Sequence, residues 1–319
     1  MSELRYHPFF DTWVITATHR QDRTFHPPAG YCPLCPTQPG GFPTEIPMAE
    51  YDIVVFENKF PSLSATPPSP AIDGTELTPV RPSSGVCEVV CYSQDHNATF
   101  ATLPLSQIRK LTRVWQQRYI ELSKRDDIDY VFIFENKGKE IGVTLSHPHG
   151  QIYGYPFIPP VLANELAAER AHFERTGRTL FADFVASELD GPRMVTANDT
   201  FLAMVPFFAR YPYEVWVTTR DPIPSLAEMT PSMLDDLASI LQIVTQKYDR
   251  LFGFSMPYIM AMHQAPCVPG YEFNRFHVEF YPPYRTADKL KYLAGSEAGA
   301  GAFINDTLPE VTAATLRDL

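Results

Sequence analysis

The sequence predicts an α+β fold in which one module of antiparallel strands and a packed helix occurs twice. The first copy comprises a strand over Cys87–Tyr92, a helix over Leu105–Lys124 and a strand over Tyr130–Phe134. The second copy comprises a strand over Tyr213–Thr218, a helix over Met233–Leu251 and a strand over Pro257–Met262. A His-x-(His or Glu) pattern follows at a matching distance in both copies, which favours duplication over a coincidence between two amphipathic helices.

The individual elements follow from side-chain periodicity. Each helix carries apolar residues at a spacing close to 3.6, and each strand is a short run of β-branched and aromatic residues. The segment from Pro160 to about Leu189, between the copies, is predicted to be helical and acidic. We expect residues 1–190 to form the N-terminal half and residues 191–319 the C-terminal half of one compact unit.

Charge and cysteine content exclude several classes of protein. The 319 residues include 26 Lys plus Arg and 37 Asp plus Glu, a net charge of −11 that argues against nucleic-acid and anionic-membrane partners. No apolar run approaches the roughly 18 residues of a membrane span. The N-terminus lacks the basic and apolar regions of a secretory signal. With an odd count of 5 cysteines, we expect a cytoplasmic protein with thiols or metal ligands instead of disulfides.

The sharpest motif is His147-Pro148-His149-Gly150-Gln151. We expect one imidazole to be held by a metal or a hydrogen bond while the other faces a substrate. Gln151 should share the strand face of His149, where its amide can donate to a phosphoryl oxygen. Neutral imidazole is nucleophilic near pH 7 and does not repel a phosphate diester. Two structural histidines at a strand start are the alternative.

A second constellation is Cys32-Pro-Leu-Cys35, which is typical of half a tetrahedral zinc site. The other half must come from residues distant in sequence, because no second Cys-x-x-Cys exists. A redox pair or two core thiols are the alternatives. A redox pair usually begins a helix in a thioredoxin-like pattern, which Pro-Leu in a loop does not suggest.

These motifs together carry a resemblance to a known family. The His147–Gln151 motif, with Asn136-Lys-Gly138 before it and Ile152-Tyr-Gly-Tyr-Pro156 after it, resembles the active-site segment of the galactose-1-phosphate uridylyltransferase family in the histidine-triad superfamily. The resemblance spans residues from about 5 to 297. Its further segments, in chain order, are His19-Arg20-Gln-Asp-Arg23, Tyr31-Cys32-Pro-Leu-Cys35, Phe56-Glu-Asn58-Lys-Phe-Pro61, Asp95-His96, Met262-His263-Gln-Ala-Pro266 and Phe276-His277-Val-Glu279-Phe-Tyr-Pro-Pro283.

The resemblance implies a duplicated histidine-triad-like fold and a nucleotidyltransferase of galactose metabolism. In the implied double displacement, His149 attacks the α-phosphorus of UDP-glucose, glucose 1-phosphate leaves, and galactose 1-phosphate then takes the uridylyl group. UDP-hexose and hexose 1-phosphate are therefore the implied substrates. The implied phosphate and nucleotide contacts are Gln151, Thr144, the Gly142 backbone, Arg20, Arg23, Asn58 and Asn136. Without the resemblance, a solvated arginine pair would be the simpler interpretation of Arg20 and Arg23.

The resemblance also implies two metal sites and a homodimer. Zinc would be held by Cys32, Cys35, His96 and His147, and a second metal, iron or zinc, by Glu165, His263, His277 and Glu279. Glu279 stands where the family commonly has a histidine, and a metal-free cluster of buried His and Glu is the alternative. Lys291 and Glu297 match a segment that contacts the sugar, often across a subunit boundary, which implies active sites near a dimer interface.

Two departures fall on hexose recognition. Phe303 stands about where a glutamine contacts the hexose in well-known members, and Ser296 replaces a common tyrosine. A related nucleotidylyltransferase that acts on ADP-glucose and phosphate is therefore an alternative. A non-enzymatic, zinc-bearing interaction module is a second alternative, against which intact His149 and Gln151 argue.

Overall fold

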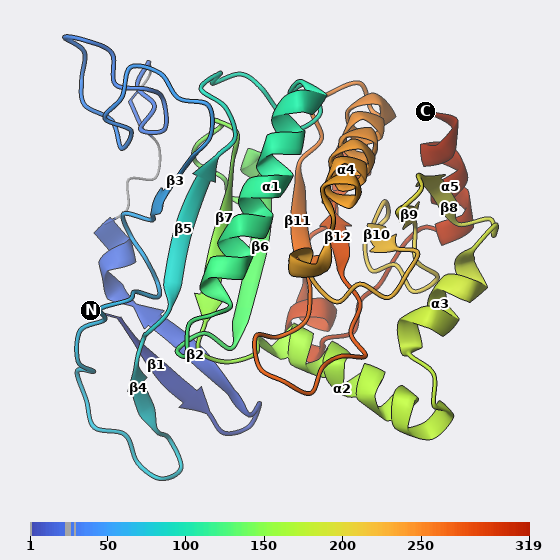
Figure 1. Ribbon diagram of the computed structural model, residues 1–319, viewed down its shortest axis with the longest axis horizontal. Coiled ribbons are helices and arrows are strands. Elements are labelled where there is room, and N and C mark those ends of the chain that lie inside the picture. Colours follow the sequence, from blue (N-terminus) through green and yellow to red (C-terminus); the bar gives the residue numbers. More distant parts are fainter. Residues whose placement is uncertain (1, 23–26, 29) are drawn as a thin grey trace.

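The computed structural model describes residues 2–22, 27–28 and 30–319, so the predicted phosphate contact Arg23 lies outside the described residues. Their main element is a nine-stranded sheet in which every neighbouring pair is antiparallel (Figure 1). Its spatial order is β3 (Val54–Glu57), β5 (Val86–Cys91), β7 (His149–Tyr155), β6 (Tyr130–Lys137), β11 (Tyr258–His263), β12 (His277–Tyr281), β10 (Val215–Thr219), β9 (Phe201–Met204) and β8 (Met194–Ala197).

The predicted duplication is visible in this order. One copy is β5, α1 (Leu105–Leu122), β6 and β7, and the other is β10, α4 (Pro231–Leu251), β11 and β12. Strands β6 and β11 pair at the centre, with Met260 opposite Glu135, so both copies share one sheet. Helices α1 and α4 lie side by side on one face of it (Figure 1). The predicted α+β class, with antiparallel strands and packed helices, is confirmed.

The two helices form because their apolar stripes are buried against the sheet. Trp115 of α1 is 1% exposed and stacks on Phe100, with ring centroids 6.2 Å apart. In α4, the Thr230 side chain accepts a hydrogen bond from the Met233 amide and Pro231 occupies the first turn, which are both favourable at a helix start. Helices α1 and α4 both agree with their predicted ranges to within two residues at either end.

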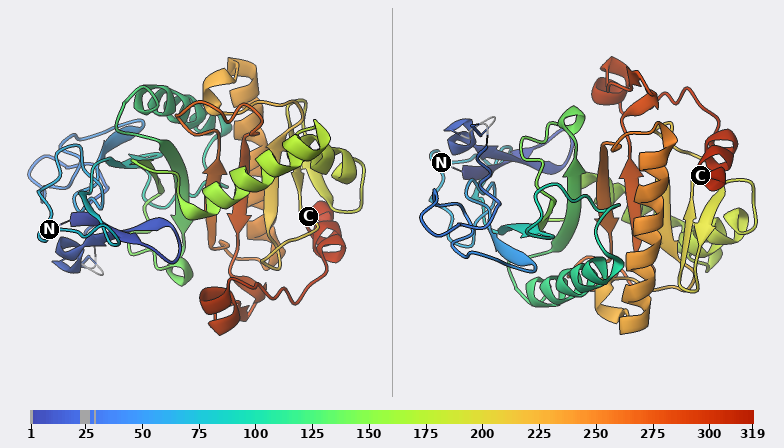
Figure 2. Two further views of the ribbon diagram at one scale, coloured as in Figure 1. Left: turned by 90° about the horizontal axis from the view of Figure 1, so that it is seen from below. Right: turned by 90° about the horizontal axis from the view of Figure 1, so that it is seen from above.

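The opposite face of the sheet carries the polar side chains. Val278 and Phe280 of β12 belong to the helix-facing core, so His277 and Glu279 project from the other side. The predicted helical segment over 160–189 forms two helices, α2 (Pro160–Thr176) and α3 (Leu180–Glu188). They separate at Gly177, whose φ of 70° ends α2 in the left-handed region. Figure 2 shows α2 crossing the sheet in the left-hand view.

Smaller elements complete the chain. A three-stranded sheet contains β1 (Ser2–His7), β2 (Thr12–Ala17) and β4 (Val80–Pro82), and a hairpin contains β13 (Tyr284–Thr286) and β14 (Lys289–Leu290). Short turns are η1 (Thr18–Asp22), η2 (Lys139–Ile141), η3 (Leu226–Glu228) and η4 (Gly295–Gly299), and the last helix is α5 (Pro309–Asp318). Within the described ranges, no helix has both the length and the apolar character that a membrane crossing requires. The division into halves at residue 190 stays a prediction.

Candidate active site

Strand register places the two groups of predicted metal ligands at opposite ends of the central sheet. At one end, β7 begins at His149, which pairs with Cys91 of β5. At the other end, His263 of β11 pairs with His277 of β12. Strand β6 lies between β7 and β11, and its first half pairs with the last residues of both strands. The start of β7 and the end of β11 are therefore at opposite ends of the sheet. The two groups of predicted metal ligands therefore lie in separate parts of the molecule.

The proton positions of His149 follow from one hydrogen bond. Its Nδ1 atom lies 2.7 Å from the carbonyl oxygen of His147. A carbonyl oxygen only accepts, so Nδ1 donates and Nε2 carries the lone pair of the neutral ring. His147 precedes the strand, in a bend before β7, so strand alternation does not force the two imidazoles onto one face. His147 is 1% exposed, whereas His149 is only half-buried.

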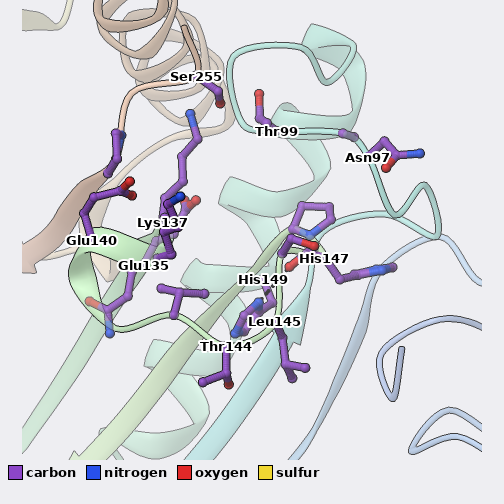
Figure 3. Close-up of a pocket in the computed structure, with 18 of the residues that line it drawn as sticks. Asn97, Thr99, Glu135, Lys137, Glu140, Thr144, Leu145, His147, His149 and Ser255 are labelled. Atoms are coloured by element: carbon purple, nitrogen blue, oxygen red, sulfur yellow. Dashed lines mark hydrogen bonds between the residues drawn. The ribbon is translucent and has the colours of Figure 1, made fainter. Parts of the chain in front are cut away.

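Two cavities meet at His149. The larger has a volume of about 590 Å³ and the smaller about 330 Å³, and His149, Thr144 and Leu145 line both. Figure 3 shows Thr144 and His149 on one side of the larger cavity, with Glu135, Lys137 and Glu140 on another. The smaller cavity is walled by Tyr31, Phe56 and Phe60 together with Asn58 and Gln151. Aromatic walls with a few polar groups suit a planar base, and the larger cavity, whose lining includes Lys137 and Lys139, suits a sugar phosphate.

Gln151 is oriented by its neighbours in the smaller cavity. Its Oε1 atom lies 3.5 Å from the Asn58 Nδ2 donor and 3.3 Å from the Tyr153 hydroxyl donor. Asn58 is fixed in turn, because its Oδ1 atom accepts the Phe60 amide at 2.9 Å. With Oε1 occupied as an acceptor, Gln151 presents Nε2 as a donor on the strand face of His149, as expected from the sequence.

Only some of the other predicted substrate contacts line the two cavities. Asn136 lines the larger cavity. Arg20 donates to the Phe60 carbonyl at 3.0 Å, behind the wall of the smaller cavity. The Gly142 amide donates to the Lys139 carbonyl oxygen at 2.9 Å. Gly142 is absent from the described lining of both cavities. Lys291 and Glu297 pair with each other at 3.1 Å and, among the described residues, line neither cavity.

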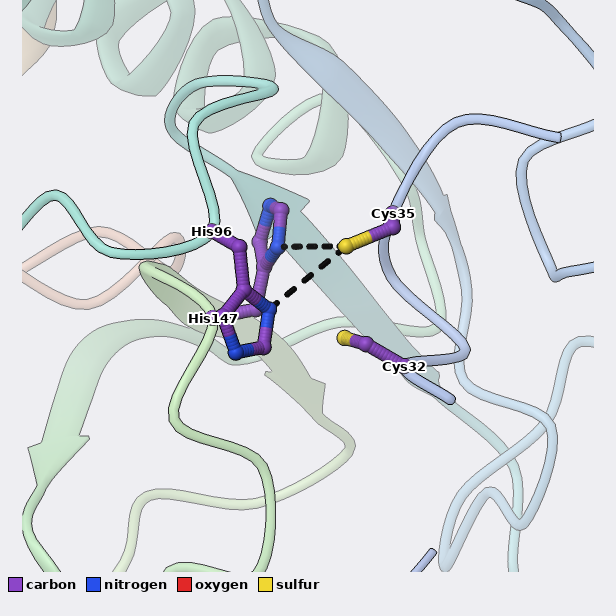
Figure 4. A group of neighbouring side chains, drawn as sticks. All are labelled: Cys32, Cys35, His96 and His147. Carbon is purple, nitrogen blue, oxygen red and sulfur yellow. Dashed lines mark hydrogen bonds between the residues drawn. The ribbon is translucent and has the colours of Figure 1, made fainter. Parts of the chain in front are cut away.

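Cys32, Cys35, His96 and His147 converge although they are distant in sequence (Figure 4). One potential ligand atom from each lies within 4.8 Å of the others. Cys35 Sγ is 3.5 Å from His96 Nδ1 and 3.6 Å from His147 Nδ1. Donor atoms at about 2.0–2.3 Å from a tetrahedral zinc stand about 3.3–3.8 Å apart, so the donor set fits zinc in both spacing and chemistry.

The surroundings of His147 favour Nδ1 as its metal-binding atom. Its Nε2 atom lies 2.8 Å from the Ser93 carbonyl, to which it must donate, and this leaves the lone pair on Nδ1. Burial lowers the pKa of His147 to about 4, so the ring is neutral at physiological pH. Burial and the neighbouring Cys32 raise the pKa of the Cys35 thiol to about 11, and a divalent cation between them would stabilise the thiolates instead.

Glu165, His263, His277 and Glu279 form the second group, with ligand atoms within 4.8 Å of one another. His277 Nδ1 lies 3.1 Å from the Arg275 carbonyl, so it donates and leaves Nε2 as the inward atom. That Nε2 atom faces Glu165 Oε1 at 3.2 Å and Glu279 Oε1 at 3.3 Å. A lone pair facing two carboxylate oxygens is repulsive unless a proton or a metal ion lies between them. The arrangement therefore fits a cation, and a metal satisfies it.

Comparisons with known proteins decide the family. A family model described as galactose-1-phosphate uridyl transferase, N-terminal domain, matches residues 1–159, and its C-terminal counterpart matches residues 165–319. The chain belongs to the galactose-1-phosphate uridyl transferase family. A family member from Thermotoga maritima, named galactose-1-phosphate uridylyltransferase, is 43% identical over 322 residues, covering 100% of this chain and 98% of the relative. The resemblance noted in the sequence is thereby confirmed.

Other relatives support this family assignment at greater distance. A galactose-1-phosphate uridylyltransferase from Schizosaccharomyces pombe is 32% identical and covers 100% of this chain and 94% of its own length. A solved structure of a uridylyltransferase mutant superimposes with a TM-score of 0.89 at 34% identity, covering 99% of this chain and 97% of that chain. An ADP-glucose phosphorylase from Arabidopsis thaliana has a TM-score of 0.74 at 22% identity, covering 100% and 99%, and shares the fold alone.

Sequence reasoning missed two residues of the site, Tyr51 and Glu135. Tyr51 donates to the Ser93 carbonyl at 2.7 Å and lies 2.6 Å from His147 Nε2, yet its loop carries no motif. Glu135 was detectable, because it is an acidic residue that directly follows the apolar run Tyr130–Phe134 and precedes Asn136. It is 4% exposed, lines the larger cavity and accepts from Tyr258 at 3.3 Å.

Proposed function

We propose that this chain transfers UMP from UDP-glucose to galactose 1-phosphate, by double displacement through a uridylyl group on His149. The relatives at 43% and 32% identity that carry this activity in their names support the reaction. The observation that carries the mechanism is the 2.7 Å hydrogen bond from His149 Nδ1 to the His147 carbonyl. This hydrogen bond leaves the lone pair on Nε2 of His149, a residue that lines both cavities.

In the first step, the Nε2 lone pair forms a bond to the α-phosphorus of UDP-glucose. The bond from that phosphorus to the bridging oxygen breaks, and glucose 1-phosphate leaves with the electron pair. The ring then carries a positive charge, because Nδ1 keeps its proton. The His147 carbonyl stabilises this charge, as an orienting acceptor does for a catalytic histidine. Gln151 Nε2 is directed to the phosphoryl oxygens, where it offsets the charge of the transition state.

In the second step, a phosphate oxygen of galactose 1-phosphate attacks the same phosphorus. The phosphorus–nitrogen bond breaks, its electron pair returns to Nε2, and UDP-galactose is released. No proton has to move to or from His149 in either step, since Nδ1 remains protonated and Nε2 alternates between lone pair and phosphorus. The chain must therefore supply position and hydrogen-bond donors, and Thr144, which lines both cavities, is a second candidate donor.

Zinc at Cys32, Cys35, His96 and His147 would act through position. Zinc supplies a rigid structural centre when bound, without redox chemistry. His147 would be the link, because the same residue offers Nδ1 to the metal and its carbonyl oxygen to His149. Holding His147 at both ends fixes the direction of the nucleophilic ring. The second group, with two carboxylates and two imidazoles, would hold iron or zinc at the other end of the sheet.

Lys291 and Glu297 would serve the active site of a partner subunit. Within the described part of the chain they do not line the cavities at His149, and they lie beside Tyr292 and Leu293, which are 73% and 49% exposed. Exposed apolar side chains next to a buried ion pair are suited to a subunit interface. This arrangement supports the proposal of a homodimer with composite active sites, which we place in the cytoplasm.

Incubation with UDP-glucose alone tests the proposal. Intact-mass analysis should show one uridylyl group per chain, located on His149 by peptide mapping, together with released glucose 1-phosphate. His149→Ala should form no adduct. His172→Ala is the control and should form the adduct normally, because His172 pairs with Asp183 at 2.8 Å and lines neither cavity. An adduct from ADP-glucose and not from UDP-glucose would assign the chain to the ADP-glucose reaction. No adduct from either nucleotide sugar would contradict the mechanism.

A further inference from the structure

Arg210 lies between the second metal group and the C-terminal segment. Its Nη2 atom donates to Glu279 Oε2 at 2.6 Å and to Glu214 Oε1 at 3.2 Å. Glu279 is 2% exposed and Glu214 is fully buried, so one guanidinium serves two buried carboxylates. A buried carboxylate without a counter-charge is strongly unfavourable. Arg210 is therefore, together with His263 and His277, one of the groups that make a glutamate tolerable at position 279.

The two oxygens of Glu279 have different surroundings. Oε1 faces the group, 3.3 Å from His277 Nε2 and 3.7 Å from His263 Nδ1. Oε2 faces away and accepts from Arg210 and from the Tyr281 hydroxyl. Since two donors occupy Oε2, only Oε1 is directed toward a metal. Glu279 is thus arranged as a one-oxygen ligand, which is the geometry that a histidine at this position would also supply.

The position of Arg210 is fixed independently of Glu279. Glu214 Oε2 accepts the amides of Arg210 and Tyr211 at 2.6 and 3.1 Å, and Trp216 Nε1 donates to Glu214 Oε1 at 2.8 Å. Glu214 therefore keeps three donors even if the guanidinium is removed. The loop before β10 is therefore held in place by Glu214, and removing the guanidinium of Arg210 should chiefly affect the contact to Glu279.

On its other side, the same loop holds the C-terminal segment. The Arg210 guanidinium lies 5.7 Å from the centroid of the Phe303 ring, within the range of a cation–π contact. Asn305 Nδ2 donates to the Ala209 carbonyl at 2.9 Å. Between them, Ile304 offers its amide to Glu297 Oε1 at 3.4 Å and accepts from Lys291 Nζ at 2.5 Å. An unbroken series of contacts thus joins Glu279 to the Lys291–Glu297 pair.

We propose that Arg210 is a positioning residue, which fixes Glu279 as a one-oxygen ligand and couples occupancy of the second metal group to the conformation of residues 291–305. The proposal rests on the proposed second metal site and on the proposed role of Lys291 and Glu297 in binding the hexose phosphate. Coupling of this kind runs through contiguous contacts and is shared between both ends. Metal binding should order residues 291–305. Loss of Arg210 should weaken both the binding of the metal and the ordering of this segment.

The primary experiment compares wild type, Arg210→Met and a matched control, Arg193→Met. Arg193 also bridges two glutamates, Glu188 at 2.8 Å and Glu310 at 2.6 Å, and lies 5.2 Å from the Phe207 ring centroid. Metal-stripped protein is loaded with Zn²⁺ and its stoichiometry measured. Arg210→Met should lose one equivalent, exchange amide hydrogens faster over residues 291–307, and raise KM for galactose 1-phosphate roughly 3- to 30-fold with a smaller change in kcat. Arg193→Met should retain both equivalents and the wild-type KM.

A second pair of variants separates the coupling from a folding defect. Glu279→His supplies a neutral donor that needs no counter-charge, so Arg210→Met/Glu279→His should regain the second equivalent. It should keep the faster exchange over residues 291–307, because the contact from Arg210 to Phe303 is still missing. Wild type that takes up a single equivalent would contradict the second site. Full stoichiometry with native exchange in Arg210→Met would contradict the role of Arg210. Uridylylation of wild type by UDP-glucose is measured separately, so a failed proposed function is distinguishable from either result.

Discussion

The hydroxyl oxygen of Tyr92 lies directly behind the α-carbon of Gly150, so that a β-carbon at position 150 would stand 2.1 Å from it. The Phe134 carbonyl oxygen would be only 3.0 Å from the same β-carbon. Gly150 separates His149, the proposed nucleophile, from Gln151 on β7. A glycine is required here because any side chain would push β7 away from its neighbours, and with it the imidazole that the strand carries.

Gly150→Ala should therefore lower activity more than stability. We expect kcat for uridylyl transfer to fall about 100-fold, because a displacement near 1 Å of a reacting group has a cost of this order. Steady-state kinetics and the amplitude of uridylyl-enzyme formation measure it. Tyr92→Phe in the same chain removes the clashing oxygen and should recover part of the loss. Equal activities of Gly150→Ala and wild type would show that the strand position is not critical.

Cys35→Ser should abolish the proposed zinc site and leave the imidazole of His149, the proposed nucleophile, less well oriented. The substitution takes away the sulfur that lies 3.5 and 3.6 Å from the two imidazoles, so His147 loses its anchor while its carbonyl still binds His149. Loss of an orienting partner of this kind typically costs about 10- to 100-fold in activity. Zinc content by mass spectrometry and kcat are the measurements. Cys267→Ser, outside the group, should leave zinc and kcat unchanged, and full zinc occupancy in Cys35→Ser would argue against the assigned ligand set.

Glu135 should make stability depend on pH. Burial raises the pKa of its carboxyl group from 4.5 to about 7, despite the opposing charge of Lys137. Between pH 4.5 and 7 the folded protein binds more protons at this group than the unfolded chain does. The stability that Glu135 contributes is therefore complete below pH 4.5 and is lost as pH rises to about 7, by up to about 3 kcal/mol.

Urea unfolding of Glu135→Gln at several pH values measures this contribution. The amide cannot ionise, so relative to wild type the variant should gain unfolding free energy between pH 4.5 and 7 and keep a constant difference above pH 7. Glu57→Gln, at an exposed carboxylate, should reproduce the wild-type profile. Parallel profiles of wild type and Glu135→Gln across this range would contradict the ionisation assigned to Glu135.

Composite active sites predict complementation between inactive variants. His149→Ala lacks the proposed nucleophile and Lys291→Met lacks the residue proposed to reach the partner's site, so each homodimer should be inactive. A mixed dimer contains one site with both native residues, so the purified mixed dimer should show about one half of wild-type activity and a random mixture of equal amounts about one quarter. Co-expression with different affinity tags and an assay of the doubly purified dimer test this. Absence of activity in that dimer would place Lys291 in the site of its own chain.

Much of the fold and candidate site could be predicted because the relevant signals are local. The stripes of α1 and α4 and the matching order of strands depend on residues that are neighbours along the chain, and the predicted bounds agree closely with the structure. The single helical segment over 160–189 was predicted without its division at Gly177, since a glycine within a helical pattern only lowers helix propensity until its φ is known.

The contacts that sequence reasoning missed are those between segments distant in the chain. Tyr51 reaches His147 across 96 positions, and Arg210 reaches Glu279 across 69. Neither residue belongs to a motif, because a tyrosine in a loop and an arginine before a strand are common in any sequence. Glu279 was recognised as a departure from its family, but the counter-charge that compensates for it could be identified only from the tertiary contacts.

The sequence by itself determined the family, the duplicated α+β module, the His147–Gln151 motif and the residue types that can bind zinc. These depend on local spacing and on residue identity, which survive without coordinates. Only the tertiary structure decided which nitrogen of His149 holds the proton, which oxygen of Glu279 faces the second group, and that a side chain at Gly150 would meet Tyr92. Hydrogen-bond direction and steric fit depend on distances of a few tenths of an ångström between segments far apart in the chain, and only packing of the folded protein sets those distances.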